Sequence, residues 1–494
     1  MATKATAAGA APGLRRDAIG LREVLFQSIT DMAPGAAIAA SIPAGVAFAG
    51  GSLPLAVIFA LVACLFCASS IGLLAREMPS AGSLATYAAR GLHPSIGFLV
   101  AWGYVLVGFL IPPLVLLQLG FTTAATINAE WHGYPASLWW PWALAGALIV
   151  LAAGFYGVRT SARLGTVLGL FEIGVFLVLA VFLLVHAGNH NTLSVFGTKY
   201  TPSGFRGISG VIGGSVYTIL AFGGFEGAAP LAEEARNPKR TIPRAVMLAT
   251  LLIGALYVFT TYAVDVAFGP AKFGSFTTGT GAASWEGLAR SLYGIFWFFV
   301  FLAIVNSTIA NANAGVNVSS RTAYAMGRIG AFPRFLAQVH PKHHSPAVAI
   351  VTAFVITVAV TLGLGLGYGA TTAFVMVATA LVIVLAAIYI LMNAACIGFF
   401  ARRRGGFNPV LHLIIPVLGI ITFIPAWLTA AGIKVFSFVA PLAPPYSYMG
   451  PGVAGFMVLG VIYLIYLYRH DPRRVVEVGL VHLDALEEDE EDGA

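Results

Sequence analysis

Charged residues are scarce in this chain of 494 residues. Asp, Glu, Lys and Arg make up 10% of it, whereas about 25% is usual in soluble globular domains. Hydrophobic residues make up 59%, which is more than a compact shape can hide from water. These values exclude a water-soluble globular protein, and the sequence predicts a protein surrounded by lipid.

Cysteine is nearly absent, since the chain has only three. So few cysteines cannot form a disulfide framework. Cys64 and Cys67 have the spacing of half a zinc site, but they lie in an apolar run without a second pair or a nearby histidine. We expect them to pack as small apolar side chains, and we predict no metal and no cofactor. The first 20 residues also lack the apolar core of a cleavable signal peptide.

Long apolar runs are what the sequence has instead. Strands of a membrane barrel would show short segments of alternating polarity, whereas these runs are long enough to cross about 30 Å of hydrocarbon as helices. We therefore predict an all-α polytopic membrane protein with about twelve transmembrane helices. The predicted spans are 31–52, 54–76, 96–124, 139–157, 164–187, 208–231, 244–268, 288–320, 346–366, 370–400, 408–431 and 449–469.

The positions of Lys and Arg predict the orientation of the chain. Of the 27 basic residues, 22 fall in the two terminal segments and the loops on their side, and five fall on the opposite side. Because Lys and Arg are enriched in cytoplasmic loops, both termini are predicted to be cytoplasmic, in a plasma membrane. This distribution accounts for the net charge of +7 without a nucleic-acid partner. Residues 470–494 are predicted to be a solvated acidic tail.

Two predicted spans contain residues that interrupt helices. The first has two Pro and two Gly residues within 12 positions, and the sixth has Gly223 and Gly224 in mid-span, close to Glu226. For either span alone, close packing of small residues is an alternative. Interruptions five spans apart indicate two inverted repeats around a site near the midplane. The predicted divisions are a cytoplasmic segment (1–30), a first repeat (31–187), a second repeat (208–400), two added helices (408–469) and the tail.

Such a site predicts a substrate with an amino group. Freed N–H groups at a half-helix N-terminus suit a carboxylate, and freed C=O groups at a half-helix C-terminus suit an ammonium group, so both together match an α-amino acid. An amine or polyamine is the main alternative, although only Glu172 and Glu226 are acidic near the midplane. An amino acid exchanger, a sodium-coupled carrier and a transporter-like sensor are further alternatives. An enzyme is not indicated, because nearly all histidines fall in loops or near span ends.

Four motifs resemble the amino acid–polyamine–organocation (APC) family of secondary transporters, which has the LeuT-like fold with broken helices one and six. They are FGGFE at 222–226 followed by EEARNP at 233–238, EMPSAGS at 77–83, GVRTSAR at 157–163 and SRTAYAM at 320–326. The resemblance implies secondary transport of amino acids by alternating access, with membrane lipid as surroundings. It says nothing about the oligomeric state.

The resemblance also implies a substrate site. The unwound segment of the first span falls on Gly35, Ala36, Ala37 and Ile38, where many relatives have Gly-x-Gly, so that methyl groups narrow the approach of a carboxylate. The carbonyls expected to bind the amine belong to the segment before the second interruption. This side of the site comprises Leu220, Ala221, Phe222, Gly223 and Gly224.

Two carboxyl groups within predicted spans, those of Glu172 and Glu226, are expected to couple transport to a proton gradient. Some proton-coupled relatives have a lysine in the fifth span where this chain has Glu172. A charged carboxyl is costly inside a membrane, so Glu172 is predicted to take up and release a proton, with a permanently protonated, structural carboxyl as the alternative. Glu226 has the same two interpretations, coupling or capping of a half-helix. Sodium coupling through the Asn-rich eighth span is the alternative.

Overall fold

The computed structural model describes residues 19–80, 82–156, 162–277, 283–328, 333–338, 346–403, 405–472 and 475. Most of the N-terminal segment, most of the acidic tail and residues 157–161 of the GVRTSAR motif lie outside them. Throughout the described ranges the secondary structure is helical, apart from one isolated bridge between Ile19 and Ala235. The predicted all-α class is confirmed.

The helical elements are numbered in chain order. The α-helices are α1 (Leu21–Met32), α2 (Pro34–Ala36), α3 (Ile42–Ala44), α4 (Val46–Ala49), α5 (Leu53–Glu77), α6 (Ser83–Gly91), α7 (Pro94–Glu130), α8 (Trp140–Tyr156), α9 (Ala162–Ala187), α10 (Ile208–Phe222), α11 (Pro238–Phe268), α12 (Trp285–Tyr293), α13 (Phe296–Arg328), α14 (Ala347–Tyr368), α15 (Ala370–Arg402), α16 (Ile415–Ala431) and α17 (Met449–His470). The 3₁₀ and π segments are η1 (Ala37–Ser41), η2 (Gly50–Ser52), η3 (Gly188–His190), η4 (Leu193–Phe196), η5 (Phe225–Leu231), η6 (Phe273–Ser275), η7 (Arg334–Ala337), η8 (Val410–Ile414) and η9 (Tyr446–Tyr448).

Ten helical stretches among the described residues are long and apolar enough to cross a membrane. One of them, Leu21–Glu77, contains the first two predicted spans, and the fourth predicted span corresponds to the shorter helix α8. The predicted span 288–320 is wrong in one respect, because it contains two helices: Gly294, with φ 55°, ends the amphipathic helix α12, and α13 begins at Phe296. The count of twelve and the five-plus-five repeat stay predictions.

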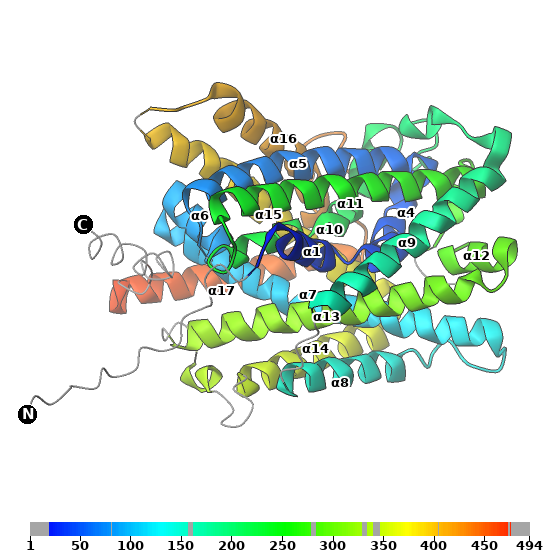
Figure 1. Cartoon of the computed structure of the whole chain (residues 1–494), viewed down its shortest axis with the longest axis horizontal. Helices are drawn as coiled ribbons and strands as arrows, with labels where there is room; N and C mark the ends of the chain where they lie inside the picture. Colours follow the sequence, from blue (N-terminus) through cyan, green and yellow to red (C-terminus); the bar gives the residue numbers. More distant parts are fainter. Residues whose placement is uncertain are drawn as a thin grey trace, which may run out of the picture.

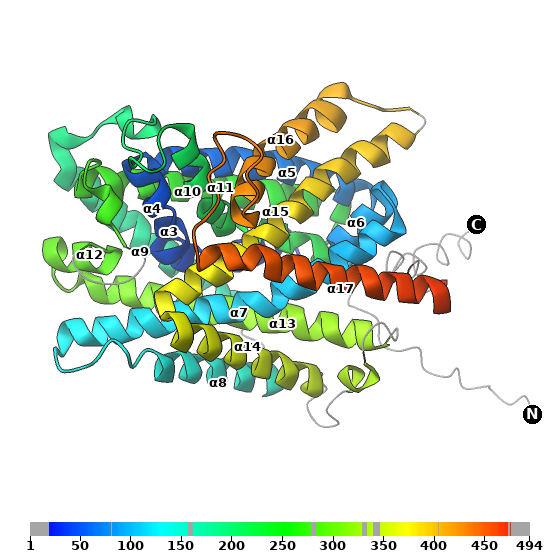
Figure 2. The same cartoon turned by 180° about the vertical axis from the view of Figure 1, so that it is seen from behind.

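The long helices run roughly parallel, along the horizontal of Figure 1, and the short segments α1 and α10 lie among them. Helix α11 packs along α5, and α13 packs along α7. Seen from behind, α17 crosses the face formed by α7 and α15, with which it is in contact (Figure 2). The broken helices are therefore enclosed by longer ones, as required for polar backbone at membrane depth.

Apolar side chains cover both the core and the outer faces of the bundle. In α15, Leu381 is fully buried, whereas Val458, Leu459 and Ile462 of α17 are each more than half exposed. A continuous apolar outer face on helices of this length is typical of contact with lipid. Together with the ten apolar stretches, this identifies an integral membrane protein.

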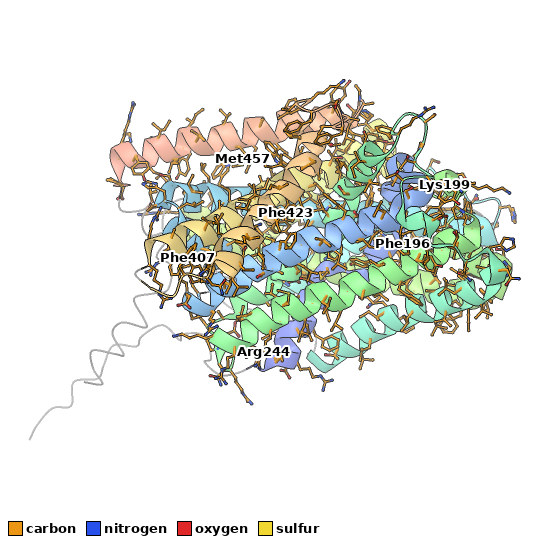
Figure 3. All side chains as sticks on the ribbon, turned by 90° about the horizontal axis from the view of Figure 1, so that it is seen from above. Phe196, Lys199, Arg244, Phe407, Phe423 and Met457 are labelled. Atoms are coloured by element: carbon orange, nitrogen blue, oxygen red, sulfur yellow. The ribbon has the colours of Figure 1, made fainter. Side chains whose placement is uncertain are left out.

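The labelled basic residues separate along the long axis of the bundle. In Figure 3, Lys199 lies toward the right-hand end, whereas Arg244 lies nearer the left-hand end, on the green helix α11. The sequence predicts that these two residues lie on opposite sides of the membrane. Which side is cytoplasmic stays a prediction.

Candidate functional site

The first interrupted helix breaks at Ala33. Helix α1 ends at Met32, Ala33 has a left-handed backbone (φ 45°, ψ 64°), and α2 starts at Pro34. Proline lacks an N–H group and disfavours the helical conformation of the residue before it, which explains the position of the break.

The predicted unwound segment, Gly35, Ala36, Ala37 and Ile38, lies too late in the chain. The structure corrects this: α2 includes Gly35 and Ala36, and the π-helical segment η1 starts at Ala37 and includes Ile38. Proline at the start of a helix is compatible with helix continuation after it, so the chain resumes its turns immediately.

The second interruption lies at Gly223 and Gly224, where the sequence predicts it. Helix α10 ends at Phe222, and the 3₁₀ segment η5 begins at Phe225. Gly224 has φ 111°, a conformation open to glycine and strained for other residues. The two glycines thus turn the chain out of its helix in mid-span.

The two breaks touch each other. A Cβ atom on Gly224 would lie 2.5 Å from the carbonyl carbon of Asp31, so the absence of a side chain allows the backbones to meet. The Tyr257 hydroxyl lies 3.2 Å from the Met32 carbonyl oxygen and 3.0 Å from that of Ala221. Asn311 Nδ2 donates to the carbonyl oxygen of Asp31 at 2.8 Å. Side chains therefore satisfy carbonyl groups that the helix breaks release.

A cavity lies beside this contact and has an empty volume of about 810 Å³, some of it open to solvent. It is bordered by both broken helices and by one face each of α7, α13 and α15. The lining residues are Asp31, Met32, Ala33, Ala36, Ala37, Ser41, Tyr104, Val107, Ile111, Leu114, Val115, Gln118, Leu220, Ala221, Gly223, Gly224, Glu226, Gly227, Asn311, Ala314, Gly315, Val318, Leu381 and Leu385.

Most of the predicted site residues line this cavity, and four do not. Gly35, Ile38, Phe222 and Glu172 are the exceptions. Phe222 is fully buried and packs edge-on against Tyr257, with ring centroids 5.4 Å apart, so it does not face the cavity. The substrate-binding role of the other residues stays a prediction.

Asp31 and Tyr104 are among the lining residues that the sequence analysis did not predict, and both carry polar groups. Asp31 is the first residue of the first predicted span, so it counted as a boundary. An acidic residue three positions before the Pro-Gly interruption was the available signal. Tyr104 lies in an apolar run without any distinguishing neighbour.

Glu226 caps the second break. Its Oε2 atom accepts a hydrogen bond from the Gly224 N–H group at 3.1 Å and another from the Tyr389 hydroxyl at 3.0 Å. Tyr104, from α7, reaches the same carboxyl. The side chain is 2% exposed, so these donors replace water. The contacts are those of the predicted capping role.

Glu172 of α9 lies against the first interrupted helix. A Cβ atom on Gly35 would be 3.1 Å from Glu172 Oε2, and the Ser307 Cβ lies on the same side. Glu172 is 3% exposed, and Oε2 has no hydrogen-bond partner among the described residues, although Asn306 and Ser307 lie beside the carboxyl. A buried carboxyl oxygen without a donor fits a protonated group better than a charged one.

A further buried carboxyl connects α12 to α7, away from the cavity. Glu286 Oε2 accepts a hydrogen bond from the Thr126 hydroxyl at 2.6 Å, and the neighbouring Arg290 forms an ion pair with Glu130. Burial raises the pKa of Glu286 to about 7, against the smaller opposing effects of the Thr126 hydrogen bond and the Arg290 charge. This carboxyl therefore titrates near neutral pH.

Comparison with known proteins decides the family. A family model described as amino acid permease matches residues 23–472. The chain belongs to the amino acid permease family. The resemblance to APC transporters is thereby confirmed.

The names of similar proteins describe different transported compounds. The chain is 31% identical to the low-affinity putrescine importer PlaP of Escherichia coli K12. The alignment spans 306 residues, which are 61% of this chain and 65% of the importer. The chain is 24% identical over 330 residues to the branched-chain amino acid permease BcaP of Bacillus subtilis, covering 62% and 66%. It is also 26% identical over 315 residues to the dicarboxylic amino acid permease of Saccharomyces cerevisiae, covering 58% and 50%. The match thus spans less than two thirds of each of these relatives.

Proposed function

We propose that this member of the amino acid permease family is a secondary transporter of small molecules that carry an amino group, either amino acids or amines. The observation that carries the proposal is the cavity between the two touching helix breaks. Among the described residues that line it, two are acidic and none is Lys, Arg or His. A cationic amino group is the substrate feature that such a lining favours.

Alternating access is supported by the asymmetry of the cavity. Its lining on α7 runs from Gln118 toward the Pro94 end of that helix. At the other end, Phe121 of α7 and Phe374 of α15 meet edge-on, with ring centroids 5.8 Å apart. In the proposed mechanism this aromatic contact would close the route past Gln118, and the transporter would open it while closing the opposite route.

Proton coupling through Glu172 belongs to the same proposal. Glu172 contacts the first interrupted helix directly after its break, at Gly35. Movement of that helix would change the surroundings of the carboxyl, and with them the cost of keeping it charged. Proton uptake would then accompany one of the two conformations, which is the requirement for symport.

Uptake into proteoliposomes tests the proposal. The purified chain is supplied with radiolabelled leucine, glutamate, lysine and putrescine, with an imposed proton gradient or an imposed sodium gradient in turn. We expect accumulation of at least one of these compounds with the proton gradient alone. Failure of all four to accumulate or exchange would refute the proposal, and accumulation that needs sodium would refute proton coupling.

A further inference from the structure

Two side-chain contacts connect helix α12 to the Glu130 end of α7. Glu286 Oε2 lies 2.6 Å from the Thr126 hydroxyl, and Arg290 forms its ion pair with Glu130, one turn further along α7. Glu286 is 5% exposed and Thr126 4%, whereas the ion pair is partly exposed to solvent. Figure 1 shows α12 at the right-hand end of the bundle, the end at which Lys199 lies in Figure 3. This is the predicted outer end.

The Thr126 hydroxyl has two close oxygen neighbours but only one hydrogen. It lies 2.8 Å from the Thr122 carbonyl oxygen, which can only accept a hydrogen bond. A charged Glu286 carboxylate can also only accept, so one of the two short contacts would lack a hydrogen. A protonated Glu286 supplies its own hydrogen to Thr126, and Thr126 then donates to Thr122. The arrangement is therefore complete only when Glu286 carries a proton.

The charged residues near Glu286 do not replace this proton. Among the described residues they are Arg290 on the same helix and Glu130 on α7, which pair with each other. The Arg290 guanidinium also lies over the ring of Trp297, with 4.1 Å between its carbon atom and the ring centroid. Glu286 Oε1 has no hydrogen-bond donor among the described residues. Burial raises the pKa of Glu286 to about 7 in spite of the Arg290 charge.

The other helices that face α12 present aromatic and apolar side chains to it. Phe176 of α9 packs edge-on against Trp285, with ring centroids 5.4 Å apart, and Glu172 lies one turn further inward on α9. Helix α13 follows α12 directly and has no charged residue between Phe296 and Arg321. Such surroundings favour the neutral form of a carboxyl.

Helix α12 contacts the same segment of α7 that carries the aromatic contact beside the cavity. Along α7, Phe121 lies between Gln118, which lines the cavity, and Thr126. These residues belong to one continuous helix. Movement of this segment away from α12 would break the contact with Thr126 and would carry Phe121 away from Phe374.

We propose that Glu286 and Thr126 form a proton-binding site that holds α12 against α7 when Glu286 is protonated, and so favours closure of the outer route past Gln118. The proposal rests on the proposed function and adds a proton-binding group distinct from Glu172. In water a glutamate loses its proton near pH 4.5, whereas buried Glu286 keeps it until about pH 7. The closed state therefore gains as the pH falls below about 7, and it loses this advantage as the pH rises through that value.

Labelling of a cysteine in the cavity tests the proposal. Leu114→Cys places a thiol in the lining, one turn inward of Gln118. A membrane-impermeant maleimide is added to intact cells without substrate, at about pH 6 and about pH 8. Each rate is divided by that of the exposed Lys199→Cys, which corrects for thiol ionisation and verifies the orientation. We expect relative labelling at least about threefold faster at the higher pH, and equal rates would overturn the proposal.

Substitutions at the two partners separate this site from other causes of pH dependence. Glu286→Gln, whose amide can donate to Thr126 at any pH, should label slowly at both pH values. Thr126→Val should label at least about twofold faster than wild type at the lower pH, because the closed state has lost a buried hydrogen bond. Full pH dependence in Glu286→Gln, or wild-type labelling of Thr126→Val at the lower pH, would overturn the proposal.

Two conservative variants serve as controls. Thr126→Ser keeps the hydroxyl and should behave as wild type. Thr123→Val removes a hydroxyl from another buried threonine of α7 and should also behave as wild type. Labelling of Lys199→Cys in each background establishes that the variant is folded and reaches the membrane. Because labelling needs no substrate, transport without pH-dependent labelling would refute this proposal and leave the proposed function intact.

Discussion

At the scale of single residues, buried carboxyls dominate the chemistry of this protein. Glu226 has hydrogen-bond donors, Glu172 Oε2 has none among the described residues, and Glu286 has one on Oε2 only. These different surroundings give identical side chains different tendencies to hold a proton. Two of the carboxyls lead to direct tests.

Glu172→Gln should abolish accumulation driven by a proton gradient and leave exchange of substrate across the membrane partly intact. Glutamine has nearly the same shape but cannot take up the proton that the proposed coupling requires. The measurement is uptake into proteoliposomes with and without a pH gradient, next to counterflow with substrate inside. Proton-driven accumulation at the wild-type rate would show that Glu172 is not the coupling residue.

Glu286 predicts a pH dependence of stability. An unfolded glutamate loses its proton near pH 4.5, whereas folded Glu286 keeps it until about pH 7. The folded state therefore binds more protons in this window, and the free energy of unfolding falls as the pH rises from 4.5 to 7, by about 3 kcal/mol at most. Glu286→Gln should flatten this region of the profile. The check is thermal unfolding of both proteins in detergent between about pH 5 and 8, and parallel profiles would contradict the prediction.

At the scale of helices, the interruptions organise the site. The second one was predictable because two adjacent glycines in an apolar span are a strong local signal. The first was misplaced because small residues continue for several positions after Pro34, and only the backbone angles show that the break precedes the proline. The contact of Gly224 with Asp31 could not be predicted, because it joins residues far apart in the sequence.

Gly224→Ala should disrupt the contact between the interrupted helices. Alanine at φ 111° is strained, by roughly 1–2 kcal/mol, and its Cβ would collide with the Asp31 backbone. We expect lower thermal stability and a loss of substrate binding of at least about tenfold. Gly204→Ala, with nothing within 4 Å of its Cβ position, is the control. Wild-type affinity in Gly224→Ala would remove this contact from the site.

At the scale of the whole molecule, composition alone predicted the class, and the apolar runs predicted most helix positions within a few residues. The short amphipathic helix α12 was merged with α13, because the glycine between them is a weak signal within one continuous run. The predicted orientation of the chain in the membrane rests only on the distribution of Lys and Arg, so it needs an experiment of its own.

Labelling of single introduced cysteines tests the orientation. Lys199→Cys should react with a membrane-impermeant maleimide in intact cells, and Arg244→Cys should react only after permeabilisation. Background labelling should be low, because Cys64, Cys67 and Cys396 are all fully buried. Labelling of Arg244→Cys in intact cells would reverse the predicted topology.

Tyr257, which lies between the two interrupted helices, has one hydroxyl hydrogen and two possible acceptors. Tyr257 faces two carbonyl oxygens, one on each interrupted helix, but a hydroxyl carries a single hydrogen. It can form a strong bond to Met32 or to Ala221, and not to both at once. If the half-helices move apart during a transport cycle, Tyr257 will keep its hydrogen bond to only one of the two carbonyl groups. The other carbonyl oxygen will then be free to accept a hydrogen bond from the ammonium group of a substrate. Tyr257 would then both connect the two interrupted helices and determine in which conformation a carbonyl oxygen becomes available to the substrate.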